Sequence, residues 1–369
     1  MTHWPDLNWL AALRRPEEVL GWSLEQWDQR VRLARRLRLL GRLAEAVLGA
    51  GLSSRLPEPV ANALLGASRL ARARSQALSW CRDEVARALD GLDAPLVLLK
   101  GAAYMAQRLP NALGRLPSDL DILLPARALP QARARLLAVG WTEVDLDDHD
   151  QRYYREWSHE LPPMRHPMHA IELDVHHNIL PPVARDRVDG DVLIEAAFAL
   201  DDASAASWWV LSKEDQVLHC AAHLFHDSEQ RDRLRDLIDL DVLLGAHAAD
   251  DPEFSARLVD RARRLGLEDA LALGVTLLRE GLGATLDPVL DGTAREALSH
   301  RRLAFLCRRF ATVLAPLEPD TEPGWQLRAS EALLLARHHW RRMPLPLLLK
   351  HSWHKLQLRG RAQTEVGPN

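Results

Sequence analysis

The segment SDLDILL, residues 118–124, is the stretch of the chain that decides the fold. Its apolar residues alternate with Asp119 and Asp121, which is the two-residue period of a β-strand. Residues two apart on a strand point to the same face, so both carboxylates share one side and the apolar side chains enter the core. Two acids on one face are costly unless water or cations reach them. Mg²⁺ suits such a site because it takes oxygen ligands and keeps substrate phosphates in its shell.

A second segment, IELDVH at residues 171–176, repeats the alternation. If its strand lies beside the first, it supplies a third carboxylate, and both Glu172 and Asp174 face the required way. The shorter, stiffer side chain favours Asp174, while Glu172 stays open as a metal ligand. Three carboxylates on two neighbouring strands can hold two metal ions about 3.5–4 Å apart, an arrangement that serves phosphoryl displacement. His176 shares this face and is a candidate for substrate contact.

Upstream of these segments, PLVLLKG at residues 95–101 is short, apolar and ends in glycine, as a buried strand does. A helix is expected to begin near Ala102, and the backbone N–H groups of such a turn bind phosphate oxygens. Gly101 would let a phosphate approach the backbone. Lys100 and Arg115 are candidates for neutralising a triphosphate. Ser118, next to the two aspartates, completes the set of candidate nucleotide-binding residues.

Composition narrows the class of protein. The 369 residues include 47 Lys and Arg against 51 Asp and Glu, a net charge of −4, so charge does not favour a nucleic-acid-binding protein. The three cysteines are widely spaced, which excludes a disulfide framework and a Cys-x-x-Cys zinc module and fits a reducing compartment. The first residues lack the features of a signal peptide, and no apolar run approaches the roughly 20 residues of a membrane helix. We therefore expect a cytoplasmic protein without membrane contact.

Along the chain, helical periodicity frames a segment of mixed pattern. Residues 1–90 are predicted to form an N-terminal helical region, 91–205 the core, and 206–369 a C-terminal helical domain that opens with Ser212 as an N-cap. The core alternates strand and helix signals. The sequence thus predicts an α+β fold, with a small mixed sheet and flanking helical regions.

Four motifs in this order together resemble the nucleotidyltransferase superfamily, which has the polymerase-β-like fold. They are LLKGAAY (98–104), RLPSDLDILL (115–124), IELDVHH (171–177) and LSKEDQVLHCAAHLFHD (211–227). More narrowly, the chain resembles a bacterial family of uncharacterised nucleotidyltransferases over roughly residues 30 to 245.

The resemblance implies that a nucleoside monophosphate passes from an NTP, the co-substrate, to an acceptor hydroxyl, with release of pyrophosphate. It implies Mg²⁺ as the cofactor, with Mn²⁺ as the alternative. Asp119 and Asp121 would be catalytic metal ligands. Asp174 would be the third carboxylate, acting as metal ligand or as base towards the acceptor.

Other interpretations remain open at this point. His219, His223 and His226 lie at positions i, i+4 and i+7 with Asp227 adjacent, a spacing that fits a zinc hydrolase, a cleft lining or simple packing. Within the cleft lining, His223 is a candidate for substrate contact. The superfamily's turn continues with a second Gly or a Ser, whereas this chain has Ala102 and Ala103. A nucleotide-binding protein without catalysis is therefore an alternative.

The acceptor is the least determined part of this hypothesis. Without a strong basic stripe, a small molecule, a peptide or a protein is favoured over nucleic acid as the acceptor. A toxin-like nucleotidyltransferase that acts on a protein or a tRNA is the remaining alternative.

Overall fold

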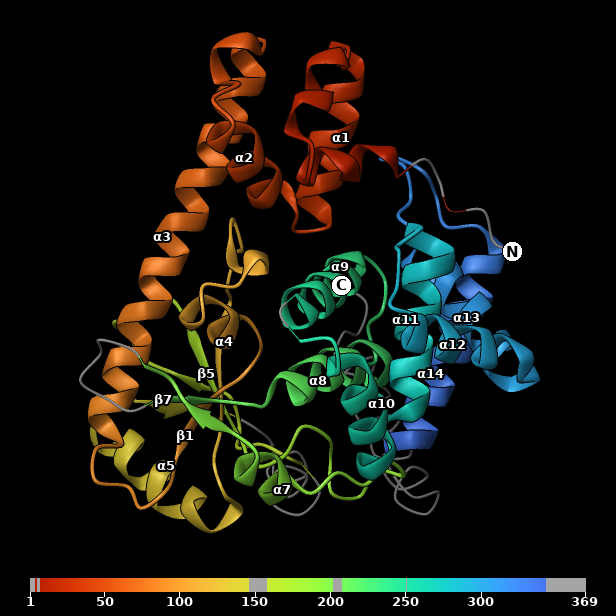
Figure 1. Cartoon of the computed structure of the whole chain (residues 1–369). Coiled ribbons are helices and arrows are strands. Elements are labelled where there is room, and N and C mark those ends of the chain that lie inside the picture. Colours follow the sequence, from red (N-terminus) through yellow and green to blue (C-terminus); the bar gives the residue numbers. More distant parts are fainter. Residues whose placement is uncertain (1–3, 5–6, 146–157, 202–207, 250, 343–369) are drawn as a thin grey trace, which may run out of the picture.

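The computed structural model describes residues 4, 7–145, 158–201, 208–249 and 251–342, and Figure 1 shows its arrangement. The architecture is α+β, with one mixed sheet flanked by helices, which confirms the predicted fold class. Among the described helices, each is too short or too polar to span a bilayer.

Helices make up the first part of the described chain. They are the 3₁₀ helices η1 (Asn8–Leu13), η2 (Pro16–Gly21) and η3 (Ser53–Arg55), and the α-helices α1 (Leu24–Arg36), α2 (Leu40–Gly49) and α3 (Glu58–Ala88). A capping box starts α1, because the Ser23 hydroxyl accepts from the Gln26 backbone while the Gln26 side chain accepts from the Ser23 backbone. The long helix α3 runs from the tip beside α2 down to the sheet (Figure 1). One continuous helix thereby connects the N-terminal helices to the sheet.

In the described part of the chain, seven strands form the sheet, in the order β3-β4-β5-β2-β1-β7-β6. Their bounds are β1 (Leu96–Leu98), β2 (Asp119–Leu123), β3 (Thr142–Glu143), β4 (Met164–Arg165), β5 (Glu172–His176), β6 (Phe198–Ala199) and β7 (Trp208–Val210). At the centre, β2 and β5 run parallel, with Asp119 opposite Glu172 and Asp121 opposite Asp174. The two acid-bearing segments are therefore hydrogen-bonded neighbours in matching register.

Short helices connect these strands. They are α4 (Lys100–Ala106), η4 (Pro110–Ala112), η5 (Ala126–Ala128), α5 (Leu129–Ala138) and α7 (Gly190–Glu195). The loop that leads into β2 touches α2 backbone to backbone: a Cβ atom built on Gly41 would lie 2.1 Å from the Gly114 carbonyl oxygen, and one on Gly114 would lie 2.2 Å from that of Gly41. Only glycine permits this approach, so α2 fixes the loop that carries the first two aspartates.

The remaining described chain is helical. It consists of α8 (Lys213–His226), α9 (Leu234–Ala248), α10 (Phe254–Leu265), α11 (Glu268–Leu282), α12 (Pro288–Ser299), α13 (Arg301–Leu314) and α14 (Trp325–Arg342). Ser212 caps α8 by accepting from the Asp215 backbone at 3.2 Å, as the sequence predicted. β7, which follows the expected boundary at residue 205, pairs with β1 in the sheet. The division into three regions stays a prediction.

The buried carboxylate of Asp239 forms ion pairs with a residue of the N-terminal helices and with one that precedes β2 in the sheet. Asp239 on α9 is 1% exposed and contacts Arg115, which precedes β2, and Arg42 on α2, whose Nη1 lies 3.3 Å from Asp239 Oδ1. The N-terminal helices, the sheet and the C-terminal helices thus share one ion-pair network.

Candidate active site

Three aspartates meet at the centre of the sheet. Asp119 and Asp121 come from β2 and Asp174 comes from β5, and one carboxylate oxygen of each lies within 4.8 Å of those of the other two. The parallel register and the two-residue period of the strands place all three side chains on the same face. This is the constellation expected of a site for divalent cations that prefer oxygen ligands.

The electrostatics of this trio suit the binding of a divalent cation. Burial, together with repulsion from Asp121, raises the pKa of Asp174 to about 7, and the same two causes raise the pKa of Asp119. Burial also disfavours the charge on Asp121, but Lys100 and His176 hold the pKa of its carboxyl well below the usual range. Carboxylates that repel one another in a partly buried site fit a divalent metal ion, which would neutralise them.

Lys100 contacts Asp121, one of the three carboxylates of the trio. It is the first residue of α4, in the left-handed region with φ of +44°, and its Nζ atom lies 2.7 Å from Asp121 Oδ1. Burial lowers the pKa of Lys100, but the charge of Asp121 outweighs this and raises the pKa above its usual value. Lys100 is therefore a cation at the edge of the trio, and its contact with phosphate stays a prediction.

Arg115 and Gly101 form a packed pair. Arg115 is buried, it contacts Asp239, and its guanidinium carbon lies 5.4 Å from the centre of the Tyr104 ring. A Cβ atom on Gly101 would approach Arg115 Nε to 2.9 Å, so this glycine makes room for the arginine side chain. The Ser118 hydroxyl is exposed and lies 3.2 Å from Asp119 Oδ1.

Glu172 stands apart from the three aspartates. Its carboxylate pairs with Arg165 on β4, and its side chain is 41% exposed. Among the described residues it joins no group that could hold a metal ion. Of the two candidates for the third carboxylate, Asp174 lies with Asp119 and Asp121, whereas Glu172 forms an ion pair with Arg165 at the surface.

His176, at the end of β5, is 4% exposed and contacts the trio directly. Its Nε2 atom lies 3.0 Å from Asp121 Oδ1, and its Nδ1 atom lies 3.2 Å from Glu160 Oε2. Burial lowers the pKa of His176, but the hydrogen bond to Asp121 and the charge of Glu160 raise it overall. Its side chain thus orients Asp121, and substrate contact by His176 stays a prediction.

A cavity of about 350 Å³ opens beside Asp119 and Asp121. Its lining brings together Lys100, Gly101, Arg115 and Ser118, all candidates from the sequence, and His223 from α8. Arginines that the sequence analysis did not single out also line it, namely Arg36, Arg38, Arg231, Arg233 and Arg235. Arginine is so abundant in this chain that these residues carried no distinct signal. The cavity has the cations that a polyphosphate requires.

A family model matches residues 23–283, which contain the three aspartates, the Lys100 turn and α8. The chain belongs to the family of uncharacterised nucleotidyltransferases. The match confirms the resemblance and extends beyond the span predicted for it. None of the curated proteins compared with the chain matches it. Membership supports nucleotidyl transfer as the class of reaction.

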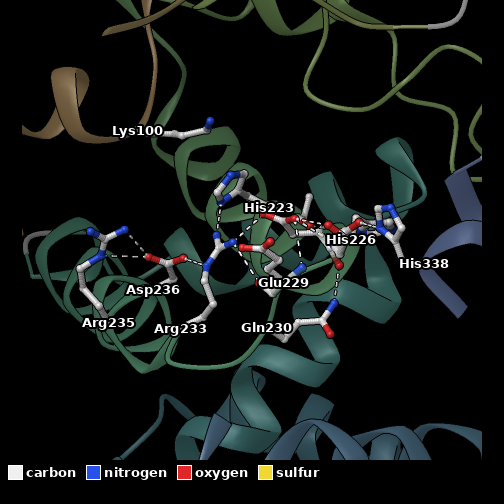
Figure 2. A network of polar contacts seen from close by, with 12 residues as sticks. Lys100, His223, His226, Glu229, Gln230, Arg233, Arg235, Asp236 and His338 are labelled. Carbon is white, nitrogen blue, oxygen red and sulfur yellow. Dashed lines mark hydrogen bonds and ion pairs between the residues drawn. The ribbon is translucent and has the colours of Figure 1, made fainter. Parts of the chain in front are cut away.

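In this family member, the turn between α8 and α9 is held by Arg233, as Figure 2 shows. Its Nη1 lies 2.5 Å from Asp227 Oδ2, its Nε lies 2.5 Å from Asp236 Oδ2, and its Nη2 donates to His223 Nδ1 at 2.8 Å. Burial, and then the charges of Lys100 and Arg233, lower the pKa of His223 to about 3. His223 is therefore neutral, with its proton on Nε2, and presents a hydrogen-bond donor at the cavity.

The histidines of α8 do not gather around a metal ion. His223 accepts from Arg233, and His226 contacts Asp186 at 2.7 Å and the Ala222 carbonyl at 3.0 Å. Burial lowers the pKa of His219 well below its usual value. In the described parts of the chain, these residues and Asp227 form no group with metal-ligand spacing. The zinc-hydrolase interpretation is not supported, because His223 is held by Arg233 and His226 by Asp186 and the Ala222 carbonyl.

Proposed function

We propose that this protein is a Mg²⁺-dependent nucleotidyltransferase, with Mn²⁺ as the alternative ion, that moves a nucleoside monophosphate from an NTP to an acceptor hydroxyl. The observation that carries this proposal is the trio of Asp119, Asp121 and Asp174 beside a cavity with cationic lining. Family membership supports the same class of reaction.

Each residue of the trio has a distinct task in this proposal. Asp119 and Asp121 hold the metal ions, and Asp174 is a third ligand or the base that takes the acceptor proton. Metal ions bound there would supply charge neutralisation of the triphosphate and a lower pKa of the acceptor hydroxyl. In the transfer, the hydroxyl oxygen forms a bond to the α-phosphorus, the bond from that phosphorus to the β-phosphate oxygen breaks, and pyrophosphate leaves.

The cavity residues serve the polyphosphate. Lys100 neutralises charge, and the Nε2–H of His223 donates to a phosphate oxygen. Arg115 and Arg233 are already held by buried or half-buried carboxylates, so they contribute a fixed positive field rather than mobile side chains. Such pre-set charge stabilises the transferring phosphoryl group without reorganisation during the reaction.

For the acceptor, we propose a small hydroxylated molecule, a peptide or a protein side chain rather than nucleic acid. The cavity lining alternates arginines with acids such as Glu229, Asp232 and Asp236, which disfavours a bare phosphate backbone.

The test begins with binding. Wild-type protein and Asp121→Asn are titrated with a non-hydrolysable ATP analogue in the presence and absence of Mg²⁺. They are then incubated with α-labelled NTPs and pools of sugars, aminoglycosides, hydroxyl-bearing peptides, proteins and tRNA. Wild type is expected to bind the analogue only with Mg²⁺ and to transfer label with release of pyrophosphate. Asp121→Asn is expected to lose about 10³-fold in transfer rate, the scale seen when one charge-stabilising group is removed.

Glu172→Gln is the matched control. It removes a carboxylate on the same face of the sheet, but that carboxylate pairs with Arg165 and does not belong to the trio. We expect its transfer rate within about threefold of wild type, in keeping with the small effect of an exposed ion pair. Transfer that is equal in wild type and Asp121→Asn would remove the trio from the mechanism. Tight Mg²⁺-dependent binding without pyrophosphate release from any pool would instead establish the non-catalytic nucleotide-binding protein.

A further inference from the structure

A second cluster of metal-ligand side chains lies next to the aspartate trio. His159, Glu160 and His176 each offer one ligand atom, and these atoms lie within 4.8 Å of one another. His176 is buried, and the other two are half-buried. This group differs in chemistry from the trio, because it offers two imidazoles and one carboxylate instead of three carboxylates.

The backbone explains why these residues meet. The segment around residues 158–161 lies antiparallel to the end of β5, with Glu160 bridged to His176. The His177 N–H donates to the His159 carbonyl at 2.7 Å, and the Leu161 N–H donates to the Val175 carbonyl at 2.9 Å. Directly opposed residues on an antiparallel pair point to the same side, so this ladder sets Glu160 against His176.

The hydrogen bonds fix the direction of the His176 lone pair. An ionised carboxylate such as that of Asp121 only accepts, so the contact with His176 Nε2 at 3.0 Å requires a proton on Nε2. In a neutral imidazole the lone pair then sits on Nδ1, towards Glu160. Nδ1 lies 3.2 Å from Glu160 Oε2 but makes no hydrogen bond with it. Without a metal ion, a second proton on Nδ1 gives an imidazolium that pairs with Glu160. A metal ion would displace that proton and join Nδ1 to the carboxylate.

His159 adds the third donor. Its Nδ1 atom is buried and has no hydrogen-bond partner among the residues that the structure describes, and its ring centre lies 5.4 Å from that of His176. A buried, unsatisfied imidazole nitrogen costs free energy unless a proton donor or a metal ion reaches it.

We propose that His159, Glu160 and His176 bind a divalent transition-metal ion, with Zn²⁺ as the reference ion, at a site separate from the aspartate trio. Two imidazoles and one carboxylate form the ligand set of mononuclear zinc sites that leave a fourth position to water or substrate. Asp121 has the place of the outer carboxylate that orients a metal-bound histidine through its other nitrogen. The new site would thus hold in position a residue that contacts the trio.

The experiment uses Co²⁺ as a spectroscopic probe in the full chain after treatment with a chelator. Tetrahedral cobalt with nitrogen ligands absorbs visible light far more strongly than octahedral cobalt with oxygen and water ligands. We expect wild type to bind one equivalent of Co²⁺ with intense visible bands, and Zn²⁺, but not Mg²⁺, to displace it. His159→Gln and Glu160→Gln are each expected to lose these bands or to weaken Co²⁺ binding by about 10- to 100-fold or more.

Two control variants make the outcome specific. Asp119→Asn removes a carboxylate of the trio alone and is expected to keep the intense bands. His169→Gln removes a histidine of another close pair, with a ring centre 5.0 Å from that of His166, and is also expected to keep the bands. Circular dichroism and thermal unfolding verify that each variant is folded, and Zn²⁺ should raise the melting temperature of wild type but not of Glu160→Gln.

Two results would overturn the proposal. One is a wild-type spectrum that shows only weak octahedral bands. The other is Co²⁺ binding with the same spectrum and affinity in wild type, His159→Gln and Glu160→Gln. Because neither readout needs an NTP or an acceptor, the outcome is independent of whether the protein transfers nucleotides.

Discussion

Replacing Asp239 by asparagine is the sharpest test of what joins the helical regions to the sheet. The carboxylate is 1% exposed and faces two guanidinium groups, those of Arg42 and Arg115. Asparagine has nearly the same shape, but one of its two terminal groups is an NH₂ group, which cannot accept a hydrogen bond from either guanidinium. The substitution therefore removes the negative charge while both positive charges stay buried.

The magnitude follows from this burial. The side chains of Arg42 and Arg115 are 11% and 10% exposed, so water reaches them poorly. Removing one partner of a buried ion pair costs about 3–5 kcal/mol, because an uncompensated charge remains. Stabilities of folded domains are about 5–15 kcal/mol, so the loss is a large part of the whole.

Urea unfolding, followed by circular dichroism and tryptophan fluorescence, measures the effect. With a slope of about 3 kcal/mol per M, the midpoint should fall by roughly 1–1.7 M. Asp260→Asn is the matched control, because Asp260 has a 54% exposed side chain and pairs with Arg263 and Arg264 on the surface of α10. That variant should lose less than about 1 kcal/mol.

A loss of less than about 1 kcal/mol in Asp239→Asn, equal to that of the exposed control, would refute the reasoning. It would mean that water or a rearranged side chain neutralises Arg42 and Arg115. A decisive addition is the double variant in which Arg115→Met accompanies Asp239→Asn. Removing one of the stranded charges should recover part of the lost stability, whereas additive losses would count against the ion-pair network.

Three further predictions test other parts of the structure. Gly114→Ala should destabilise the protein by more than about 2 kcal/mol, because φ is +67° and the new Cβ would meet Gly41, whereas Gly66→Ala on α3 has open space and should stabilise it by about 0.5–1 kcal/mol; thermal unfolding compares them. Burial, helped by Lys213, lowers the pKa of His247 to about 4, so the folded state favours the neutral imidazole. The free energy of unfolding should therefore be highest above about pH 6.5 and fall by about 3 kcal/mol as the pH drops towards 4. His247→Leu should remove this pH dependence in urea unfolding, and an unchanged dependence would contradict the assignment. Lys100→Met should bind Mn²⁺ about tenfold more tightly without nucleotide, because the ammonium group no longer competes for the Asp121 carboxylate, yet bind NTP more weakly; titration followed by electron paramagnetic resonance would show equal Mn²⁺ affinities if Lys100 played no such part.

Local patterns in the sequence were enough to predict the strands β1, β2 and β5 and the aspartates. The alternation in SDLDILL and IELDVH is a property of each segment alone, since a strand's two-residue period sets which side chains share a face. The Ser212 cap and the N-terminal helices were equally accessible, because caps and helical periods also depend on neighbours in the chain. These features therefore needed no knowledge of the tertiary structure.

Contacts between distant segments could not be predicted in this way. Lys100 and Arg115 were predicted to neutralise a triphosphate, and that stays a prediction. What the sequence did not reveal is that Arg115 contacts Asp239, 124 residues away, and that Lys100 contacts Asp121. In a chain rich in arginine, nothing local tells a buried, paired guanidinium from a solvated one. The arginines of the α8–α9 turn were not predicted as site residues, because their local sequence does not distinguish them from other arginines.

The sequence by itself determined the carboxylates, their strands and the face on which they lie, because strand geometry is local. Only the tertiary structure decided which carboxylate completes the trio, since the pairing of β4 with β5 brings Arg165 to Glu172 and leaves Asp174 beside Asp121. It alone also brought His159 and Glu160 against His176. A pairing between segments depends on how the whole core packs, and no short stretch of residues contains that information.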